Sequence, residues 1–401
     1  MKGFFALLVL ITATPSAHAE RWILKNPKSP AISSQAIRTF DLNGDHYVVV
    51  NAPKFSTLEA SLSASAEQAF QDLEISLPTT QMQEINTDTK AWHPVKMRYK
   101  DLPSERDGRG VIVAVVDTGV DFTHTALRDH MWVNSREIAG NGVDDDGNGF
   151  IDDIHGFDFE SDDSDPSDDA GHGTHCAGII GASMDAATEA QGIAPGAKIM
   201  AVRIIGNEQK GFISDAVAGI KYAVDNGATV LSNSWRVYRS WSSYDPSDKN
   251  VALLREAIVY AGSKGAIFVA AAGNETQDLD DAAGDPMFPG GFVGLSNMVV
   301  VAASSEDGTP AYFSNYGATK VNVAAPGNEI ISTIPGNHWS SMSGTSMAAP
   351  LVAGAFARGL SASFSFDVAI AKLVATSLPA DTWKGRLRAG GVIRPFEFLA
   401  P

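Results

Sequence analysis

The sequence VIVAVVDTGVD, residues 111–121, decides the fold. Its first six residues are all apolar, which is typical of a strand buried on both faces of a parallel sheet. The run ends at Asp117, followed by Thr118 and Gly119. Sheets of this kind place functional residues at the carboxyl ends of their strands, so Asp117 is a candidate site residue. The alternative, that Asp117 only caps a turn, is the role that we expect of Asp121.

Four further apolar runs follow and alternate with predicted helices. The runs are KIMAVRII from residue 198, ATVLSNSW from 228, AIFVAAAG from 266 and MVVVAAS from 298. The helices have apolar faces made by Ile213, Val217, Ile220 and Val224 in one, and by Val251, Leu254, Ile258 and Ala261 in the other. Gly227 and Gly265 follow them as helix stops. This alternation predicts an α/β fold with a doubly wound, mostly parallel sheet.

The residues before this sheet predict a small, separate α+β unit. It has a strand at HYVVV from residue 46, a helix with one apolar face, and an alternating strand at LEISL from residue 73. The apolar face of that helix consists of Leu58, Leu62, Ala66, Ala69 and Leu73. A polar stretch without periodicity, residues 86–110, then indicates a linker. We therefore expect a leading unit at residues 20–95 and a main domain at residues 96–401.

The first 19 residues have the parts of a secretory signal peptide. Lys2 is followed by an apolar run from Phe4 to about Ala13 and by the small-residue cleavage site Ala17-His18-Ala19. A membrane anchor is the alternative, but the run is about half as long as a spanning helix requires. No later segment is long enough to span a membrane. We expect residues 1–19 to be removed and the protein to be exported, either to a periplasm or out of the cell.

The composition is that of a soluble globular protein, with 44% hydrophobic residues and a formal net charge of −17. This negative charge argues against nucleic acid or an anionic membrane surface as a partner. Cys176 is the only cysteine, so an internal disulfide is impossible in spite of the expected export. Stability must come from the core or from bound ions.

Ser346 lies in SMSGTSMAAP, residues 341–350, among residues that are almost all small. Small neighbours let another backbone approach, and the helical run that follows would place the hydroxyl at the positive end of a helix dipole. These conditions suit a nucleophile, although a simple helix cap is the alternative. A nucleophilic serine needs a histidine as its base, and no histidine follows residue 338. The base must therefore lie earlier in the chain.

His172 is the best candidate for this base. It stands between two glycines in GHGTHCAGIIGA, residues 171–182, at the start of an apolar helical run. The glycines expose its imidazole and let a substrate backbone come near. His175, one turn later, better fits a structural role inside the helix. Metal binding by this pair is a weaker alternative, because the HExxH signature is absent.

Asn274 ends another predicted strand, in FVAAAGNE, residues 268–275. Its amide can donate to the oxyanion that forms when a serine attacks a carbonyl group. The candidate residues then occur in the order Asp117, His172, Asn274, Ser346. Together the motifs DTGVD, GHGTHCAG, AAGN and GTSMAAP resemble the subtilisin-type serine peptidases, over roughly residues 90–400.

The resemblance implies a role for each candidate. Ser346 is the nucleophile, His172 the general base and then acid, and Asp117 the carboxylate that orients the imidazole. Asn274 and the backbone N–H of Ser346 form the oxyanion hole. It further implies a monomeric endopeptidase that acts on polypeptides, with the leading unit as a prosegment that assists folding, inhibits the enzyme and is cut off.

A pocket for the residue before the scissile bond is also implied by the resemblance. Its two walls are SNSW, residues 232–235, and AAAGN, residues 270–274. The residues expected to bind substrate are Gly211, Ser234, Trp235, Arg236, Ala272 and Gly273. Cys176 falls where the proteinase K branch of the family has a cysteine beneath the histidine, and a small core residue is the role that we expect of it.

Arg236 departs from the family, which usually has glycine after this pocket wall. Its guanidinium could point to solvent while its stem packs along the rim. It could instead reach over the pocket mouth and favour an acidic residue before the cut. A third possibility is that it narrows the pocket toward small residues. The strand that would pair with substrate also departs from the pattern, because it keeps only Gly211 of the usual two glycines.

The acidic run DDDGNGFIDDIH, from residue 144, resembles a calcium-binding loop. Oxygen ligands at alternate positions around a central glycine suit a hard cation. The candidate ligands are Asp144, Asp146, Asn148, Phe150 and Asp152. His155 occupies the twelfth position, where a bidentate glutamate is usual, so another residue has to complete the shell. A solvated loop without an ion is the alternative, and a weaker second acidic group comprises Asp278, Asp280, Asp281 and Asp285.

These features predict a secreted, calcium-stabilised serine endopeptidase that is made as a precursor and processes itself. The alternative is a catalytically silent subtilisin-like protein that binds peptides. Every catalytic position is filled in this sequence, and a protein that only binds would be free to lose those residues. The sequence therefore favours the enzyme.

Overall fold

The computed structural model of the chain describes residues 19–28, 36–53, 66–85, 89–238 and 248–400. The chain divides into two compact units, Met1–Asp72 and Leu73–Pro401. This division falls earlier than the boundary near residue 95 that we expected from the sequence. Apart from Ala19, the expected signal peptide lies outside the described residues.

The first unit contains an antiparallel sheet of four strands in the order β2-β3-β1-β4. The strands are β1 Ala19–Lys25, β2 Arg38–Leu42, β3 Asp45–Pro53 and β4 Gln68–Gln71. Trp22, Leu24, Val48 and Val50 form its core together with Ala66. The predicted strand at residues 46–50 is confirmed within β3.

The predicted helix of the leading unit is wrong where the structure describes it. Residues 68–71 form β4, which pairs with β1, so pairing across the sheet overrides the local helical pattern. Residues 54–65 of that prediction lie outside the described residues.

The second unit is built on a sheet of nine strands, in the order β19-β20-β16-β15-β13-β11-β7-β9-β8. The five predicted runs form β7 Ile112–Asp117, β9 Lys198–Arg203, β11 Val230–Asn233, β13 Ile267–Ala271 and β15 Met298–Ser304. The sheet is completed by β8 Gly156–Asp158, β16 Val323–Pro326, β19 Leu378–Pro379 and β20 Gly391–Val392. Every pairing in it is parallel except that of β19 with β20.

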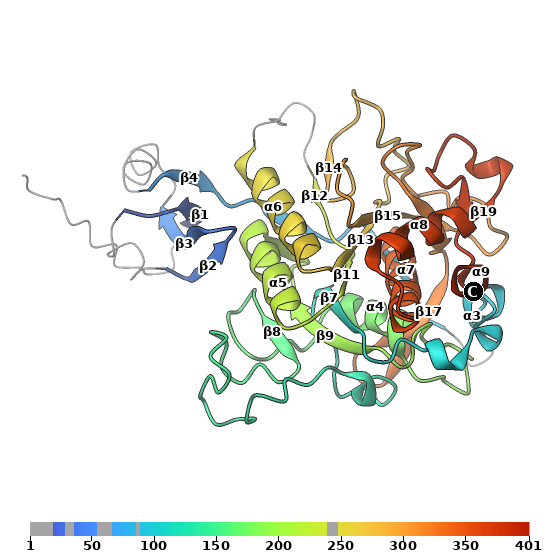
Figure 1. The fold of residues 1–401 in the computed structure, drawn as a ribbon, viewed down its shortest axis with the longest axis horizontal. Coiled ribbons are helices and arrows are strands. Elements are labelled where there is room, and N and C mark those ends of the chain that lie inside the picture. Colours follow the sequence, from blue (N-terminus) through green and yellow to red (C-terminus); the bar gives the residue numbers. More distant parts are fainter. Residues whose placement is uncertain (1–18, 29–35, 54–65, 86–88, 239–247, 401) are drawn as a thin grey trace, which may run out of the picture. The chain divides into compact units, whose positions relative to one another are not determined.

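Helices cover both faces of this sheet (Figure 1). On one face lie α5 Ile213–Asp225 and α6 Lys249–Ser263, and on the other α4 His172–Gly181 and α7 Thr345–Ser361. Gly227 and Gly265, which follow α5 and α6, have φ of +90° and +82°, a backbone conformation that glycine adopts without steric cost. The predicted doubly wound α/β fold is therefore confirmed.

Shorter elements complete the second unit. The helices are α3 His93–Lys96, α8 Phe366–Thr376 and α9 Pro395–Leu399, with 3-10 turns at Tyr99–Asp101, Ser104–Arg106, Arg128–His130 and Asp381–Trp383. β12 Val237–Tyr238 pairs with β14 Met287–Phe288. Within the described ranges, every helix is too short or too polar to cross a membrane.

Residues 74–83 lie in the second unit as an extended segment with two short strands, and we call them the threaded segment. β5 Glu74–Ser76 forms an antiparallel pair with β10 Lys210–Phe212. β6 Gln81–Gln83 pairs with β18 His338–Ser343, whose other neighbour is β17 Ile330–Ile334. The predicted strand at residues 73–77 is thus confirmed, but its partner belongs to the main domain.

Candidate active site

Asp117 and His172 form a hydrogen-bonded pair at the carboxyl edge of the sheet. Asp117 is the last residue of β7, and His172 is the first of α4. His172 Nδ1 lies 2.7 Å from Asp117 Oδ1, and the two side chains are 4% and 1% exposed. The carboxylate accepts the proton of Nδ1, which leaves Nε2 as the basic nitrogen. Nε2 has no hydrogen-bond partner among the described residues, so it remains available for a reacting hydroxyl.

The pKa of His172 reflects two opposing effects. Burial lowers it, but the charge of Asp117 and the hydrogen bond to that carboxylate outweigh burial, and the pKa is raised above its ordinary value. His175 is equally buried, with its Nε2 only 3.2 Å from the carbonyl oxygen of Ser340, and burial lowers its pKa to about 3. His175 therefore stays neutral inside the helix, as a structural role requires.

Two glycines allow α4 to approach β7 closely enough for this pair. A Cβ on Gly173 would lie 2.0 Å from the carbonyl oxygen of Gly119. Gly119 itself has φ of +98°, and a Cβ there would lie 2.4 Å from the carbonyl oxygen of Pro166. A side chain at either position would push the helix from the strand and separate His172 from Asp117.

Asp168 ties the same helix and strand together, and sequence reasoning missed it. Its Oδ1 accepts from Thr118 Oγ1 at 2.9 Å, and its Oδ2 accepts from Thr174 N and Oγ1 at 2.8 and 2.6 Å. Thr118 Oγ1 in turn accepts from the N–H of Gly173 at 2.9 Å. Burial raises the pKa of Asp168. No helix-capping signal marked it in the sequence, because the N-cap of α4 is Gly171 and Asp168 lies three residues earlier.

Ser346 is the second residue of α7 and is fully buried. Its hydroxyl makes only a weak contact, 3.5 Å from the carbonyl oxygen of Ser234. Its own carbonyl oxygen accepts from Ser234 Oγ at 3.1 Å and from Cys176 Sγ at 3.4 Å. Burial raises the pKa of the Cys176 thiol, so this group stays protonated and packs beneath the site.

Asn274 follows β13, and Thr345 fixes the orientation of its amide. Asn274 Oδ1 accepts from the N–H and the hydroxyl of Thr345 at 2.9 and 2.8 Å. Thr345 Oγ1 is itself held by the N–H of Gly273 at 3.0 Å. Because the amide oxygen is occupied in this way, the amide nitrogen points to the opposite side. There Nδ2 donates to the carbonyl oxygen of Thr79 at 2.7 Å.

Thr79 belongs to the threaded segment, which forms backbone pairings both before and after the Thr79 carbonyl group. Before it, Ile75 lies opposite Gly211, and Ser76 exchanges backbone hydrogen bonds of 2.9 and 2.8 Å with Arg236. After it, Gln81 lies opposite Ser343, close to Ser346 in sequence. The peptide group after Thr79 is thus presented to the Asn274 amide in extended form.

The six expected substrate-binding residues have different environments in the structure. Gly211 and Arg236 pair with the segment through their backbones, as described above, and Ser234 bonds the Ser346 carbonyl. Trp235 and Ala272 are buried at 1% and 0% exposure. Gly273 has φ of +99°, and a Cβ there would lie 2.4 Å from Asn315 Nδ2, so glycine is required. The Arg236 guanidinium does not point to solvent; it donates to Glu275.

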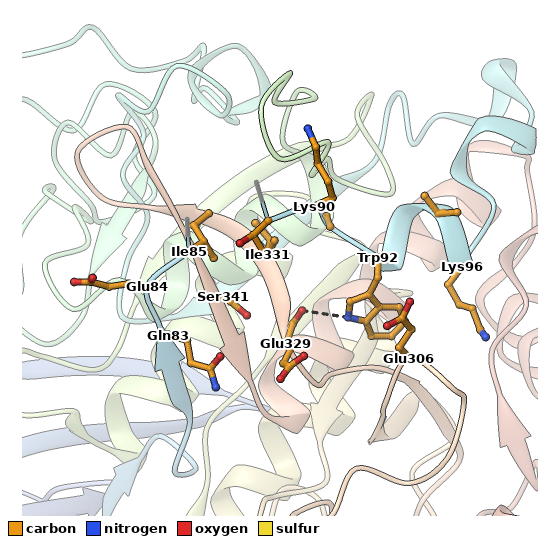
Figure 2. Close-up of a pocket in the computed structure, with 13 residues that line it drawn as sticks. Gln83, Glu84, Ile85, Lys90, Trp92, Lys96, Glu306, Glu329, Ile331 and Ser341 are labelled. Atoms are coloured by element: carbon orange, nitrogen blue, oxygen red, sulfur yellow. Dashed lines mark hydrogen bonds between the residues drawn. The ribbon is translucent and has the colours of Figure 1, made fainter. Parts of the chain in front are cut away.

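A cavity of about 630 Å³ adjoins the far end of the threaded segment (Figure 2). Gln83, Glu84, Ile85, Lys90, Trp92, Glu329 and Ser341 are among the residues that line it. The Trp92 Nε1–H donates to the carbonyl oxygens of Asn328 and Glu329 at 3.1 and 3.2 Å. The lining does not include the catalytic candidates, so the cavity is separate from the reacting groups.

The acidic loop brings Asp144 and Asp146 together with Glu137. One carboxylate oxygen from each of the three lies within 4.8 Å of the other two. The Asp152 carboxylate is turned elsewhere and accepts from the N–H groups of residues 140, 141 and 142, at 2.7, 3.1 and 2.9 Å. Sequence reasoning missed Glu137 because it lies seven residues before Asp144, outside the loop pattern.

The remaining expected ligands of this loop have other partners in the structure. Asn148 donates from Nδ2 to Asp153 at 3.0 Å, and its Oδ1 accepts from the N–H of Phe150 at 2.7 Å. Asp153 also accepts from Tyr222 Oη at 2.7 Å, and burial raises its pKa. The weaker group at residues 278–285 forms no cluster of three carboxylates within the described part of the chain.

Comparison with known proteins identifies similar chains. Residues 108–377 match the model of the subtilase family. Thermitase of Thermoactinomyces vulgaris is 36% identical over 266 residues, which cover 66% of this chain and 80% of that protein. The thermophilic serine proteinase of Bacillus sp. (strain AK1) is 39% identical over 61% of this chain and 51% of its own length. Subtilisin Savinase of Lederbergia lenta is 34% identical over 62% and 76%.

Proposed function

Because the chain belongs to the subtilase family of serine endopeptidases, we propose that it cuts polypeptides through Ser346, His172 and Asp117. The observation that carries the proposal is the 2.7 Å hydrogen bond between His172 and Asp117, beside a peptide carbonyl that accepts from Asn274. Burying a carboxylate with an imidazole costs free energy, and a protein that only bound peptides would gain nothing from the pair.

In the proposed reaction, His172 Nε2 takes the hydroxyl proton of Ser346 while Oγ attacks the carbonyl carbon. The negative charge on the carbonyl oxygen is stabilised by Asn274 Nδ2 and the backbone N–H of Ser346. The imidazolium, stabilised by Asp117, gives its proton to the leaving amine, and an acyl-enzyme remains on Ser346. Water, deprotonated by the same Nε2, then hydrolyses this ester.

A fluorophosphonate probe tests this proposal against the silent alternative, because the probe reacts only with an activated serine. We expect the processed protein to be labelled and Ser346→Ala to remain unlabelled. Ser361→Ala, at the far end of the same helix, is the matched control and should label like the wild type. A wild-type protein that is folded but neither labels nor cleaves peptides would support the silent binding protein.

We further propose that the chain is a precursor that cuts itself between Thr79 and Thr80. Two features support this bond: the Thr79 carbonyl oxygen accepts from Asn274 Nδ2, and strand pairings flank it on both sides. Residues 20–79 would then be the inhibitory prosegment, which is shorter than the leading unit expected from the sequence. Residues 1–19, as a signal peptide, would direct export.

Processing can be followed by mass spectrometry of the purified protein. We expect wild-type protein to begin at Thr80 and Ser346→Ala to keep its prosegment. Peptidase activity should appear only as the precursor disappears, since the threaded segment occupies the site until then. A new N-terminus elsewhere would refute the assignment of the bond, and normal processing of pure Ser346→Ala would refute self-cleavage.

A structural calcium ion is the third part of the proposal. Glu137, Asp144 and Asp146 fit a hard cation, because their three carboxylates lie close together and offer only oxygen ligands. Asp146 also pairs with Arg136 at 2.8 Å, but that guanidinium is 58% exposed and can move to solvent. Bound calcium would offset two of the three negative charges and add to the hydrogen bonds by which Glu137 already accepts from the N–H groups of Asp145 and Asp146.

A further inference from the structure

Arg236 and Glu275 form an ion pair between the two expected walls of the primary pocket. Arg236 directly follows Ser234 and Trp235 of one wall, and Glu275 directly follows Asn274 of the other. Arg236 Nη1 donates to Glu275 Oε1, and the side chains are only 16% and 25% exposed. The pair therefore connects two chain segments that have to stand apart if a bulky side chain is to enter between them.

The Glu275 end of this bridge is held rigidly. Asn315, which is fully buried, donates from Nδ2 to Glu275 Oε2 at 2.8 Å and to the carbonyl oxygen of Ala272 at 2.9 Å. Its Oδ1 accepts from the N–H of Glu275 at 3.0 Å. Because the carboxylate is fixed in this way, it holds the guanidinium in place and neutralises its charge.

The threaded segment shows which side chains of a bound chain the protein encloses. Ile75 and Leu77 are 1% and 9% exposed, and Pro78 is also buried. Thr79, whose carbonyl oxygen is held by Asn274, is exposed. Among residues 75–79, Thr79, next to the proposed scissile bond, is therefore the one that is exposed.

We propose that the Arg236–Glu275 ion pair closes the primary pocket to large side chains and so selects small residues immediately before the cut. Selectivity then comes from apolar residues further upstream, at the positions of Ile75, Leu77 and Pro78. This inference rests on the proposed peptidase function. The ion pair favours a narrowed primary pocket over the hypothesis that Arg236 attracts an acidic residue, because Glu275 already neutralises the charge of Arg236.

A peptide series based on the chain's own sequence tests the inference. Each peptide keeps Ile-Ser-Leu-Pro upstream, as at residues 75–78, and varies the next residue among Thr, Ala, Leu, Phe, Asp and Lys. For the processed enzyme we expect kcat/KM for Thr or Ala to exceed that for Phe by at least about tenfold. In Arg236→Ala the ratio of Phe to Thr should rise about tenfold or more, because the bridge is lost.

Glu275→Gln is the matched variant, because it keeps the size of the side chain and removes its charge. We expect this variant to weaken the bridge and release the guanidinium. Its kcat/KM for the Asp peptide relative to the Thr peptide should then rise, whereas the wild type should not prefer the Asp peptide. A wild-type preference for Asp that disappears in Arg236→Ala would overturn narrowing in favour of charge recognition. A wild-type preference for Phe, or an unchanged Phe-to-Thr ratio in Arg236→Ala, would also overturn it.

The fluorophosphonate probe separates this inference from the peptidase proposal. If wild type and variants label on Ser346 with equal stoichiometry, the catalytic group is intact and the ratios report on the pocket alone. If the wild type does not label, the peptidase proposal itself fails.

Discussion

The catalytic group and the acidic loop both hold carboxylates in fixed positions, but by different means. Asp117 and Asp168 are buried, and their partners come from β7, α4 and the turns beside them. Asp144 and Asp152 accept mainly from N–H groups of nearby turns in their own loop. The first arrangement depends on packing between distant segments, and the second gathers three carboxylates with one arginine beside them. We therefore expect a bound cation to stabilise the loop, where three carboxylates lie together, and to leave the catalytic group unaffected.

The largest expected effect is that of Asp117→Asn. An amide at this position no longer accepts the Nδ1 proton in the same way, so Nε2 carries a proton and cannot act as base. We expect kcat to fall by about 10⁴-fold, as in other Ser-His-Asp enzymes, with a melting temperature close to that of the wild type. Single-turnover kinetics and calorimetry measure the two quantities. If added calcium restored the activity of Asp117→Asn, the catalytic group would depend on a cation and would not be ordered by the fold alone.

Thr345→Val tests whether the hydrogen bond from the Thr345 hydroxyl to Asn274 Oδ1, which orients the Asn274 amide, contributes to kcat. The valine side chain keeps the shape but cannot donate to Asn274 Oδ1 or accept from Gly273 N–H, so only the backbone N–H of residue 345 still holds the amide oxygen. We expect kcat to fall about tenfold, the value of roughly one hydrogen bond, with KM nearly unchanged. Thr345→Ser, which keeps the hydroxyl, should restore most of kcat; equal losses in both variants would indicate a packing effect.

The pH profile should show the raised pKa of His172. The base must be neutral, so kcat/KM falls as the pH drops below this pKa, and the acid limb should lie above the ordinary histidine value of about 6.5. Removing the carboxylate charge in Asp117→Asn leaves burial as the main effect, so its residual activity should have a limb at lower pH. A limb that did not move would mean that Asp117 does not set this pKa.

The smallest expected effect on catalysis comes from removing calcium, which we expect to act on stability. A cation that binds only the folded loop stabilises by mass action, about 2.7 kcal/mol at a concentration 100 times the dissociation constant. Chelator should lower the melting temperature of the processed enzyme by several degrees. Asp144→Asn should abolish this sensitivity and Asp152→Asn should preserve most of it, because the Asp152 carboxylate lies outside the cluster. If chelator lowered the melting temperature of the wild type and of Asp144→Asn equally, calcium would not bind at this cluster.

The sequence predicted the site residues best where they lie at the end of a strand or the start of a helix. Asp117 and His172 stand at a strand end and a helix start, and short motifs mark both positions, so the order of elements was enough to place them. Glu137 and Asp168 were missed because their roles depend on where a loop folds back. The Arg236–Glu275 bridge was also beyond prediction, because it joins side chains 39 positions apart. The leading helix was wrong at β4, since a four-residue strand has too few residues for periodicity to identify it.

The strand pairings of the threaded segment have a consequence for the kind of molecule that the site accepts. If residues 74–79 leave after the proposed cut, β10 becomes a sheet edge whose outward N–H and C=O groups lack these partners, whereas β6 remains part of the processed chain. A substrate that pairs with this edge must present its backbone in extended form at the positions that Glu74–Ser76 occupy in the precursor. Helices and strands inside folded proteins have already committed those groups. We therefore expect the enzyme to cut extended segments of polypeptides in preference to the helices and strands of folded proteins.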